Sequence, residues 1–454
     1  MQEVRQSAHG HFSSRFVFIL AAVSAAVGLG NIWRFPYLAG ENGGGAFVII
    51  YLLCVLLVCE PIMVAEVMLG RRGRQSPINT LKRLAFEEGA SDQWKYLGWL
   101  GVVAGFLILS FYSVIAGWSL SYIFQTASGT FADATAETAE AGFNALIGSP
   151  ARLIFWHSIF MAMVIWVVAN GVEQGLENAV KWLMPPLFVL LLVMVGYAMG
   201  AGEYWQAVDY LFRPDFSVVT PGTVLAAMGQ AFFSVSLGMG TIMAYGAYLP
   251  HDAVIPRTTM TVVACDTLVA ILAGVAIFPI VFAAGLDPAG GPGLIFMTLT
   301  VAFGQMPMGL PFGTLFFILL TVAAWTSAIS LLEPAVAWLV EHRRMSRPWA
   351  AGIMGVLAWI VGLGSALSFN AWTDYTLFGL TFQGLSEYVS TTLMLPLGGV
   401  LIAVFAGYTM SRHSSVEELG IGDGLAYSVW RLLVRYVAPL GVLAVFLNVV
   451  GVFG

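Results

Sequence analysis

Eleven long apolar stretches run through the sequence and restrict the chain to a fold that sits in a lipid bilayer. Hydrophobic residues make up 59% of the 454 residues and charged residues only 10%, whereas about 25% of a soluble domain is charged. Each stretch is long enough to cross the hydrocarbon core as a helix. The predicted spans are 16–38, 44–69, 96–125, 152–170, 178–200, 221–248, 257–285, 310–341, 348–369, 381–407 and 430–453.

The loops between these stretches predict the orientation of the chain. Fourteen Lys and Arg residues lie in the loops of one side, and only Arg152 and Arg213 lie on the other. Because Lys and Arg accumulate in cytoplasmic loops, we expect a cytoplasmic N-terminus and, with an odd number of spans, an external C-terminus. The first 15 residues lack the order of a cleaved signal peptide. The sequence has no stripe of basic residues that would indicate a nucleic-acid partner.

Two of the stretches are interrupted by glycine in corresponding places, at 25–31 (AAVGLGN) and at 232–240 (FFSVSLGMG). They lie five spans apart and therefore run in opposite directions. Paired interruptions of this kind are typical of transporters built from inverted repeats, which bind substrate at the breaks. The predicted division is 1–15 cytoplasmic segment, 16–200 first repeat, 201–220 outer loop, 221–407 second repeat, 408–429 cytoplasmic loop and 430–454 last span.

The first interruption combines features that favour a binding site. Gly28 and Gly30 each disfavour a helix by about 1 kcal/mol relative to Ala, and backbone groups freed in a membrane persist only where they line a cavity. Freed N–H groups near Leu29 and Gly30 suit a carboxylate. The oxygen ligands offered to an alkali cation are the carbonyls of Ser24, Ala26 and Val27 and the side chain of Asn31. The alternative is that the glycines serve close helix packing.

Three polar residues in other spans add to this set. Asp266 is a carboxylate in the middle of a span, where a charge is costly and usually functional. Thr326 and Ser327 follow the carbonyl of Ala323 and, with Ser24 and Val27, form a possible second cation site. The alternative for the hydroxyls is a hydrogen bond to their own helix.

Charged residues near the span ends suggest gates. Arg34 and Glu387 are placed to pair above the site, although Arg34 can also extend to lipid headgroups. We interpret Glu60, Glu66 and Glu333 as structural polar contacts. The sequence GLGSALS (362–368) offers a serine nucleophile, but apart from His157 no histidine lies at plausible depth in an apolar span and no metal cluster appears, so a membrane enzyme is disfavoured. A channel, a uniporter and a non-transporting sensor are the remaining alternatives.

Taken together, three motifs resemble the neurotransmitter:sodium symporter family: GLGNIWRFPYLAGENGGGAF (28–47), GQAFFSVSLGMG (229–240) and WTSAISLLEP (325–334). The resemblance extends over nearly the whole chain and is to the bacterial branch with 11 spans. It implies an all-α membrane fold of 5+5 inverted repeats with discontinuous spans 1 and 6, plus an eleventh span. It also implies a multi-pass protein of the bacterial inner (plasma) membrane, monomeric or weakly dimeric, that is not an enzyme.

The resemblance further implies two sodium sites and a substrate pocket. The first sodium site comprises the Ala26 carbonyl, Asn31, Ser234, Asp266 and the substrate carboxylate. The second comprises the carbonyls of Ser24, Val27 and Ala323 with Thr326 and Ser327. Tyr112 would bind the substrate carboxylate and Phe233 would close above it, with Arg34, Glu387 and Gln230 as the outer gate. The implied pocket is Ala26, Leu29, Gly30, Ile108, Tyr112, Phe233, Ser236, Met239, Ser327 and Leu331.

The chain departs from the family pattern at several positions. Asp266 stands where an asparagine often ligates sodium, and Ala270 lacks the hydroxyl that chloride-dependent members use. Because a carboxylate already supplies the negative charge, we expect no chloride requirement. In span 5, Gly175 and Pro185 have a spacing with which related members unwind this helix, although a simple proline kink is the alternative.

At the cytoplasmic end, His9 and Phe12 replace the Arg and Trp that the family usually has, and the facing acid is Glu341. Because histidine titrates near neutrality, this substitution suggests that inward opening depends on cytoplasmic pH. Arg5 is the alternative partner for Glu341.

The substrate prediction rests on the small residues of the first break. Amine transporters of the family carry Asp at the position of Gly28, so glycine favours a substrate with its own carboxylate. Ala26 in place of glycine argues against GABA, betaine or taurine. An apolar pocket of Ile108, Met239, Leu331 and Phe233 predicts a neutral, hydrophobic or aromatic L-α-amino acid. The alternative is a small one, alanine or glycine, and taurine is less favoured.

Overall fold

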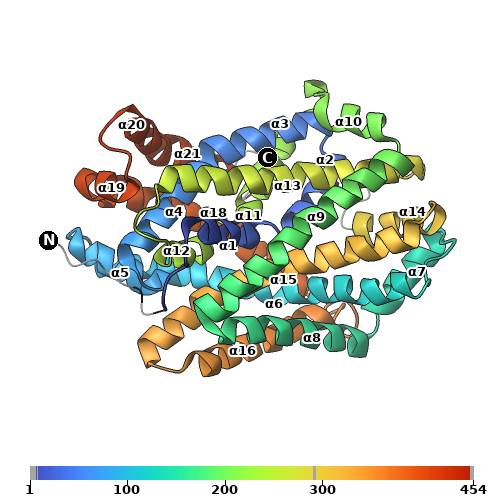
Figure 1. Cartoon of the computed structure of the whole chain (residues 1–454), viewed down its shortest axis with the longest axis horizontal. Coiled ribbons are helices and arrows are strands. Elements are labelled where there is room, and N and C mark those ends of the chain that lie inside the picture. Colours follow the sequence, from blue (N-terminus) through green and yellow to red (C-terminus); the bar gives the residue numbers. More distant parts are fainter. Residues whose placement is uncertain (1–6, 8, 290–292, 450–454) are drawn as a thin grey trace.

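The computed structural model describes residues 7, 9–289 and 293–449, and nearly all of them lie in helices (Figure 1). Within these ranges no β-strand forms, and only isolated bridges join Gly44 to Pro214 and Leu377 to Leu380. Arg5 lies outside the described residues. The predicted all-α fold is therefore confirmed.

In the described part of the chain, eight continuous helices are long and apolar enough to cross a membrane, and a bent pair makes a ninth candidate. The bent pair is Arg15–Ala26 and Gly30–Glu41, which meet at 52°. These nine coincide, to within a few residues, with predicted spans 1–5 and 7–10. The eight are Gly45–Gly73, Asp92–Ala127, Pro150–Ala169, Val172–Ala201, Ile255–Ala283, Gly309–Arg343, Arg347–Leu367 and Phe382–Thr409.

The predicted sixth and eleventh spans are assembled from shorter helices. The sixth consists of α11 (Pro221–Ser234) and α12 (Thr241–Ala247). The eleventh consists of α20 (Leu425–Leu432), η10 (Leu433–Val437) and α21 (Ala438–Val449). The count of eleven spans and the division into repeats remain predictions.

The break in span 1 follows from its local sequence. Helix α1 (Arg15–Ala26) ends where Val27 turns to an extended conformation, with φ −70° and ψ 109°. A single π-helical turn, η1 (Gly30–Arg34), then leads into α2 (Phe35–Glu41), which carries a proline in its first turn. Proline is tolerated there because the first N–H groups of a helix have no partner. The chain therefore restarts as a helix after the glycines.

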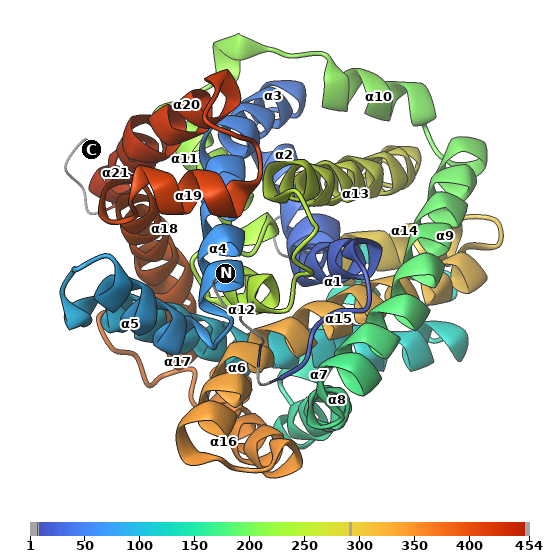
Figure 2. The same ribbon diagram turned by 60° about the vertical axis from the view of Figure 1, so that its left-hand side comes forward.

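The break in span 6 covers residues 235–240 and uses the left-handed region of the backbone three times. Ser236, Gly238 and Gly240 have φ values of 56°, 77° and 73°. A side chain disfavours this conformation, so two of the three positions being glycine explains why the helix stops here. Figure 2 shows α1 and α12 in the middle of the bundle; around them lie α4 (Glu60–Gly73), α13 (Ile255–Ala283), α9 (Asn178–Ala201) and α15 (Gly309–Arg343).

Three long helices face the two breaks and carry the polar residues of the site. Helix α13 (Ile255–Ala283) holds Asp266, α15 (Gly309–Arg343) holds Thr326 and Ser327, and α6 (Lys95–Ala127) holds Tyr112. The other elements are α3 (Gly45–Cys54), η2 (Val55–Cys59), α4 (Glu60–Gly73), α5 (Pro77–Glu87), η3 (Asp92–Trp94), α7 (Ala136–Ile147), α8 (Pro150–Ala169), η4 (Val172–Glu177), α9 (Asn178–Ala201), α10 (Tyr204–Phe212), η5 (Phe216–Val218), η7 (Leu294–Thr298), α14 (Leu299–Gln305), α16 (Arg347–Leu367), α17 (Phe382–Glu387), η8 (Tyr388–Met394), α18 (Leu395–Val404), η9 (Phe405–Thr409) and α19 (Arg412–Leu419).

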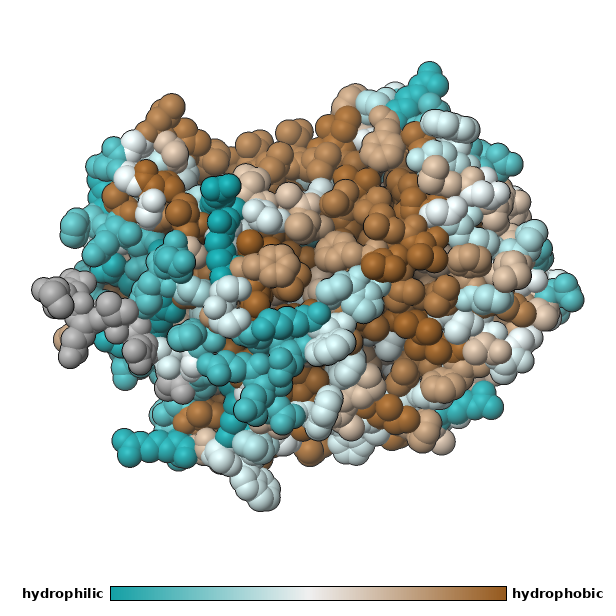
Figure 3. Space-filling model, viewed as in Figure 1, coloured by the Kyte–Doolittle hydropathy of each residue, from teal (hydrophilic) through white to brown (hydrophobic). Residues whose placement is uncertain are grey.

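The surface of the molecule divides as a membrane protein requires. Figure 3 shows a broad hydrophobic region across the middle, with hydrophilic residues gathered toward the two ends of the long axis. We call the end that carries Arg71, Arg72 and Arg74 the basic end; helices α5 and α19 lie there, on the left of Figure 1.

Candidate functional site

Asp266 is the centre of a fully buried polar cluster beside the break in span 1. Its side chain is 0% exposed, as is that of Asn31. Asn31 Nδ2 donates to Asp266 Oδ1 at 2.7 Å, and Ser234 Oγ donates to Asp266 Oδ2 at 2.6 Å. The structure therefore brings together three residues that the sequence analysis assigned to the first cation site. Tyr51 adds a hydroxyl 3.3 Å from Ser234 Oγ.

The charge of this cluster is not balanced by a basic side chain. Among the described residues, Asp266 forms no ion pair with Lys, Arg or His. Nor does the described part of the chain hold a group of three His, Cys, Asp or Glu residues able to bind a metal ion. One carboxylate with neutral amide and hydroxyl oxygens is a hard donor set of low charge. It fits a monovalent alkali cation better than a transition metal.

A second cluster lies on the other side of the same break, where α15 meets α1. Ser327 Oγ donates to the carbonyl of Val27 at 2.9 Å and lies 3.3 Å from the carbonyl of Ser24. Thr326 Oγ1 donates back to its own helix, to the carbonyl of Ala323 at 3.0 Å. The Thr326 hydroxyl therefore bonds within its own helix, as the alternative interpretation expected. The Ser327 hydroxyl instead forms a hydrogen bond between span 8 and span 1. All five residues are buried and contribute only neutral oxygens.

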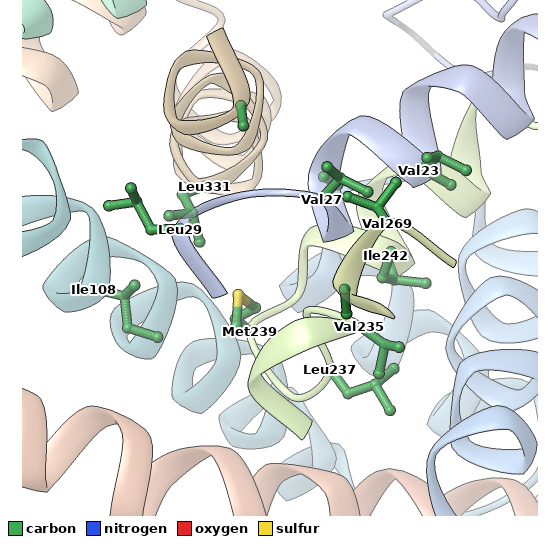
Figure 4. Packing of buried hydrophobic residues seen from close by; sticks show 14 of the residues in the cluster. Val23, Val27, Leu29, Ile108, Val235, Leu237, Met239, Ile242, Val269 and Leu331 are labelled. Carbon is green, nitrogen blue, oxygen red and sulfur yellow. The ribbon is translucent and has the colours of Figure 1, made fainter. Parts of the chain in front are cut away.

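A small, partly open cavity adjoins both breaks and is lined by residues of α1, α6, α15 and the break in span 6. Figure 4 shows Ile108, Met239 and Leu331, from three different elements, around the curved backbone of the break. In the described part of the chain, no charged side chain lines this cavity. Its lining is Ala25, Ala26, Gly28, Gly30, Ile108, Tyr112, Phe233, Ser236, Met239, Ser327 and Leu331.

This lining contains nine of the ten predicted substrate residues. Leu29 takes part through its backbone, because its N–H donates to Tyr112 Oη at 3.1 Å. Sequence reasoning did not place Ala25 in the site, yet the Ala25 carbonyl accepts a 2.8 Å hydrogen bond from Ser236 Oγ. That bond ties the two breaks together. The sequence hinted at this bond in one way: a carbonyl group at a helix break has no partner within its own helix and must find one elsewhere.

Gly28 is the point at which the cavity and the second cluster touch. A Cβ atom at Gly28 would lie 2.4 Å from Ser327 Oγ and 2.6 Å from Tyr112 Oη. These distances are shorter than any ordinary contact, so a side chain at position 28 would displace one or both hydroxyls. The position therefore requires glycine for close approach.

On the side away from the basic end, Phe233 and Arg34 cover the cavity. A Cβ atom at Gly30 would lie 2.9 Å from Phe233 Cδ1, and the Arg34 guanidinium stacks 4.8 Å from the centre of the Phe233 ring. Gln230 Nε2 donates to the Gly30 carbonyl at 2.7 Å. Among the described residues, no ion pair within 4.0 Å joins Arg34 to Glu387, which is exposed. In this conformation Arg34 covers the cavity by stacking on the Phe233 ring. The ion pair between Arg34 and Glu387 remains a prediction.

At the basic end, Glu341 collects hydrogen bonds from three segments. His9 Nε2 lies 3.0 Å from Glu341 Oε1. Ser76 contributes its N–H at 2.7 Å and its hydroxyl at 2.5 Å, and Asn79 contributes its amide at 2.7 Å. Phe12 is fully buried against Tyr245 and Tyr248. We call His9, Glu341, Ser76 and Asn79 the inner latch; sequence reasoning identified the first two residues and missed the other two.

The buried acids Glu60, Glu66 and Glu333, which the sequence analysis interpreted as structural polar contacts, each accept a hydrogen bond from another segment. Glu66 Oε1 accepts the N–H of Gly238 at 2.7 Å, which supports the break in span 6. Glu333 accepts the hydroxyl of Tyr248 at 2.7 Å and pairs with Arg347. Glu60 lies 3.3 Å from the hydroxyl of Thr259. These contacts hold the inner half of the site in place.

Comparison with known proteins identifies one family. The family model of the Sodium:neurotransmitter symporter family matches residues 9–144 and 142–453. The uncharacterized sodium-dependent transporter YhdH of Bacillus subtilis is 38% identical and covers 97% of this chain and 98% of its own length. An uncharacterized sodium-dependent transporter of Haemophilus influenzae is 33% identical, covering 96% of this chain and 97% of its own length.

A solved structure, that of MhsT in complex with L-phenylalanine, matches the fold. The TM-score is 0.89 at 42% sequence identity, and the alignment covers 97% of this chain and 99% of MhsT. The similarity therefore includes both breaks and the helices around them.

Proposed function

Because the chain belongs to the Sodium:neurotransmitter symporter family, we propose that it imports a neutral, hydrophobic L-α-amino acid together with sodium by alternating access. Members of this family are sodium-dependent membrane transporters rather than enzymes. We further infer two sodium sites and independence from chloride.

One observation supports the proposal most strongly. The Asp266 cluster, whose carboxylate has no basic partner among the described residues, and the apolar cavity both adjoin the break in span 1. Asp266 and Asn31 adjoin the break on one side, and the cavity opens on the other. A substrate carboxylate near Tyr112 and the N–H groups of the break would reach the first cation site. Ion and substrate would then raise each other's affinity reciprocally.

The cavity lining supports a hydrophobic amino acid. Ile108, Met239 and Leu331 are apolar, and Met239 is adaptable in shape. Position 28 leaves no room for the acid that would pair with an amine substrate. MhsT, which is 42% identical, was solved with L-phenylalanine. Alanine or glycine is the alternative substrate.

Asp266 also supports independence from chloride, because the site already holds a fixed negative charge next to the proposed cation. Two sodium ions and a zwitterion would carry net charge across the membrane, and each charge is worth about 2.3 kcal/mol per 100 mV. We further propose a bacterial plasma-membrane location, a cytoplasmic basic end and N-terminus, and an external C-terminus. A monomer or weak dimer is expected.

The test is uptake into proteoliposomes with an imposed sodium gradient. We expect uptake of labelled L-phenylalanine or L-leucine that stops when external sodium is replaced by choline. A competition panel of L-amino acids, taurine and an amine identifies the class of substrate. Competition by alanine and glycine alone would favour the small-substrate alternative. Competition by taurine or an amine, but by no hydrophobic amino acid, would overturn the assignment.

A further inference from the structure

A cavity of ≈ 500 Å³ lies at the basic end, far from the substrate site in sequence and structure. One wall is a single face of α5 together with Gln75, which lies two residues before the helix; it is formed by Gln75, Asn79, Lys82, Arg83 and Phe86. The other wall is formed by Ala90 and Asp92, in the segment that leads from α5 into η3. We call this cavity the α5 groove. Neither the transport site nor the inner latch accounts for its basic side chains.

Two basic side chains, Lys82 and Arg83, and one acidic side chain, Asp92, line the α5 groove. Arg83 pairs with Glu87 at 3.1 Å, and Asp92 pairs with Lys95. In the part of the chain that the structure describes, Lys82 forms no ion pair within 4.0 Å. The side-chain amides of Gln75 and Asn79 line the same groove. The Asn79 amide is bonded to Glu341. The Lys82 ammonium, the Arg83 guanidinium and the Gln75 amide are a donor set that suits a phosphate group.

Exposed aromatic residues place the α5 groove at the membrane interface. Phe86 is 85% exposed and Tyr96 is 63% exposed. Trp94 packs against Phe405 of span 10, with ring centres 5.0 Å apart. Aromatic residues flanked by Lys and Arg are typical of the headgroup layer. The groove therefore opens where lipid headgroups would lie.

We propose that the α5 groove binds the phosphate headgroup of an anionic phospholipid from the cytoplasmic leaflet. Lys82 and Arg83 bind the phosphate, and Phe86 lies along the upper part of the acyl chains. A basic pocket on the cytoplasmic side of a membrane protein has the charge that anionic headgroups require. The proposal rests on the orientation given above, which puts the basic end in the cytoplasm.

The position of the groove connects lipid binding to the inner latch. Asn79 lines the groove and also donates its amide to Glu341, while Ser76, just before α5, supplies two more hydrogen bonds. A headgroup held by α5 fixes the helix that presents these donors. Binding therefore favours the conformation in which the latch is closed, because a ligand shifts an equilibrium toward the state it binds better.

The first test measures binding of phosphatidylglycerol to delipidated full-length transporter by native mass spectrometry. The variant is Lys82→Gln with Arg83→Gln. The matched control is Arg257→Gln with Arg343→Gln, which removes two exposed cytoplasmic charges away from the groove. We expect the groove variant to bind about 30-fold more weakly, about fivefold for each charge near a lipid surface, and the control to bind as the wild type does. Equal binding by all three proteins, or an equal loss in the control, would overturn the proposal.

Two further measurements complete the test. Inorganic phosphate at the same concentration should not displace phosphatidylglycerol, and displacement would instead indicate a site for free anions and overturn lipid recognition. Phosphatidylglycerol should also slow hydrogen exchange at residues 9–15 in the wild type but not in the groove variant. Unchanged exchange in the wild type would overturn the connection to the latch. Should the double variant fail to fold, Lys82→Gln alone removes the unpaired charge from an exposed position.

Discussion

The two oxygen clusters beside the break in span 1 differ in what holds them together. The Asp266 cluster contains a full negative charge, bonded to Asn31 and Ser234 at 2.7 and 2.6 Å. The Ser327 cluster contains only carbonyl and hydroxyl oxygens, with its shortest contact between spans at 2.9 Å. A charge attracts a cation over several ångströms, whereas neutral dipoles must surround it closely. The first cluster therefore depends mainly on charge and the second on the fit between α1 and α15.

Replacing Asp266 with Asn should have the largest effect, because it removes the charge and keeps the shape. We expect the sodium concentration for half-maximal uptake to rise about 10- to 100-fold, since interactions with a charged group contribute about 1.5–3 kcal/mol. Sodium titration of uptake in proteoliposomes measures this change. Asp252→Asn, on an exposed acid, is the control. An unchanged sodium requirement would remove Asp266 from the first site.

Gly28→Ala tests whether the two clusters share one backbone. The new Cβ would lie 2.4 Å from Ser327 Oγ and 2.6 Å from Tyr112 Oη, and overpacking of this kind costs about 1–3 kcal/mol. We expect about a tenfold loss of affinity for sodium and for the amino acid together. Gly229→Ala is the control because a Cβ there meets nothing within 4 Å. Loss of affinity for only one of the two ligands would show that the sites are separate at this point.

Ser327→Ala should have a smaller effect, because the second cluster loses one neutral ligand among several. We expect sodium affinity to fall about fivefold, as for a hydrogen bond worth about 1 kcal/mol. Isotope exchange at varied sodium concentration is the measurement. Ser119→Ala, whose hydroxyl bonds only to the Ile115 carbonyl of its own helix, serves for comparison. A loss as large as that of Asp266→Asn would contradict the distinction between the clusters.

Replacing external chloride with gluconate should have the smallest effect. Since Asp266 already provides a negative charge beside the first site, we expect uptake by the wild type to change by less than about twofold. The measurement is initial uptake at constant sodium concentration. A several-fold stimulation by chloride would mean that the carboxylate does not play this role.

The sequence alone predicted the features that are local. Nine spans were placed to within a few residues because hydrophobic length is a property of a continuous segment. The break at 28–30 was also predictable, since glycine disfavours a helix wherever it occurs, and Asp266 stood out because an acid is unusual in hydrocarbon. The family resemblance added the partners from other spans.

The parts that could not be predicted depend on side chains that are distant in sequence. Arg34 and Glu387 have opposite charges and suitable positions, yet Arg34 packs on Phe233. Asn79 belongs to an ordinary amphipathic helix and Ser76 directly precedes it, and neither gave a signal of its role at Glu341. Ser13 likewise donates to Glu177, a contact across 164 residues that no local pattern indicates. Such contacts depend on how helices pack.

What the sequence determined by itself is the environment of this protein, its succession of helices and the two places where they break, because each follows from the chemistry of neighbouring residues. What the tertiary structure decided is the set of contacts between distant segments: Ser327 with Val27 and Ser236 with Ala25 at the breaks, and Glu341 with His9 at the basic end. A difference of one helical turn in packing would move these atoms by about 5 Å. The packing of the whole fold therefore determines the distances between the oxygen atoms around Asp266 and Ser327.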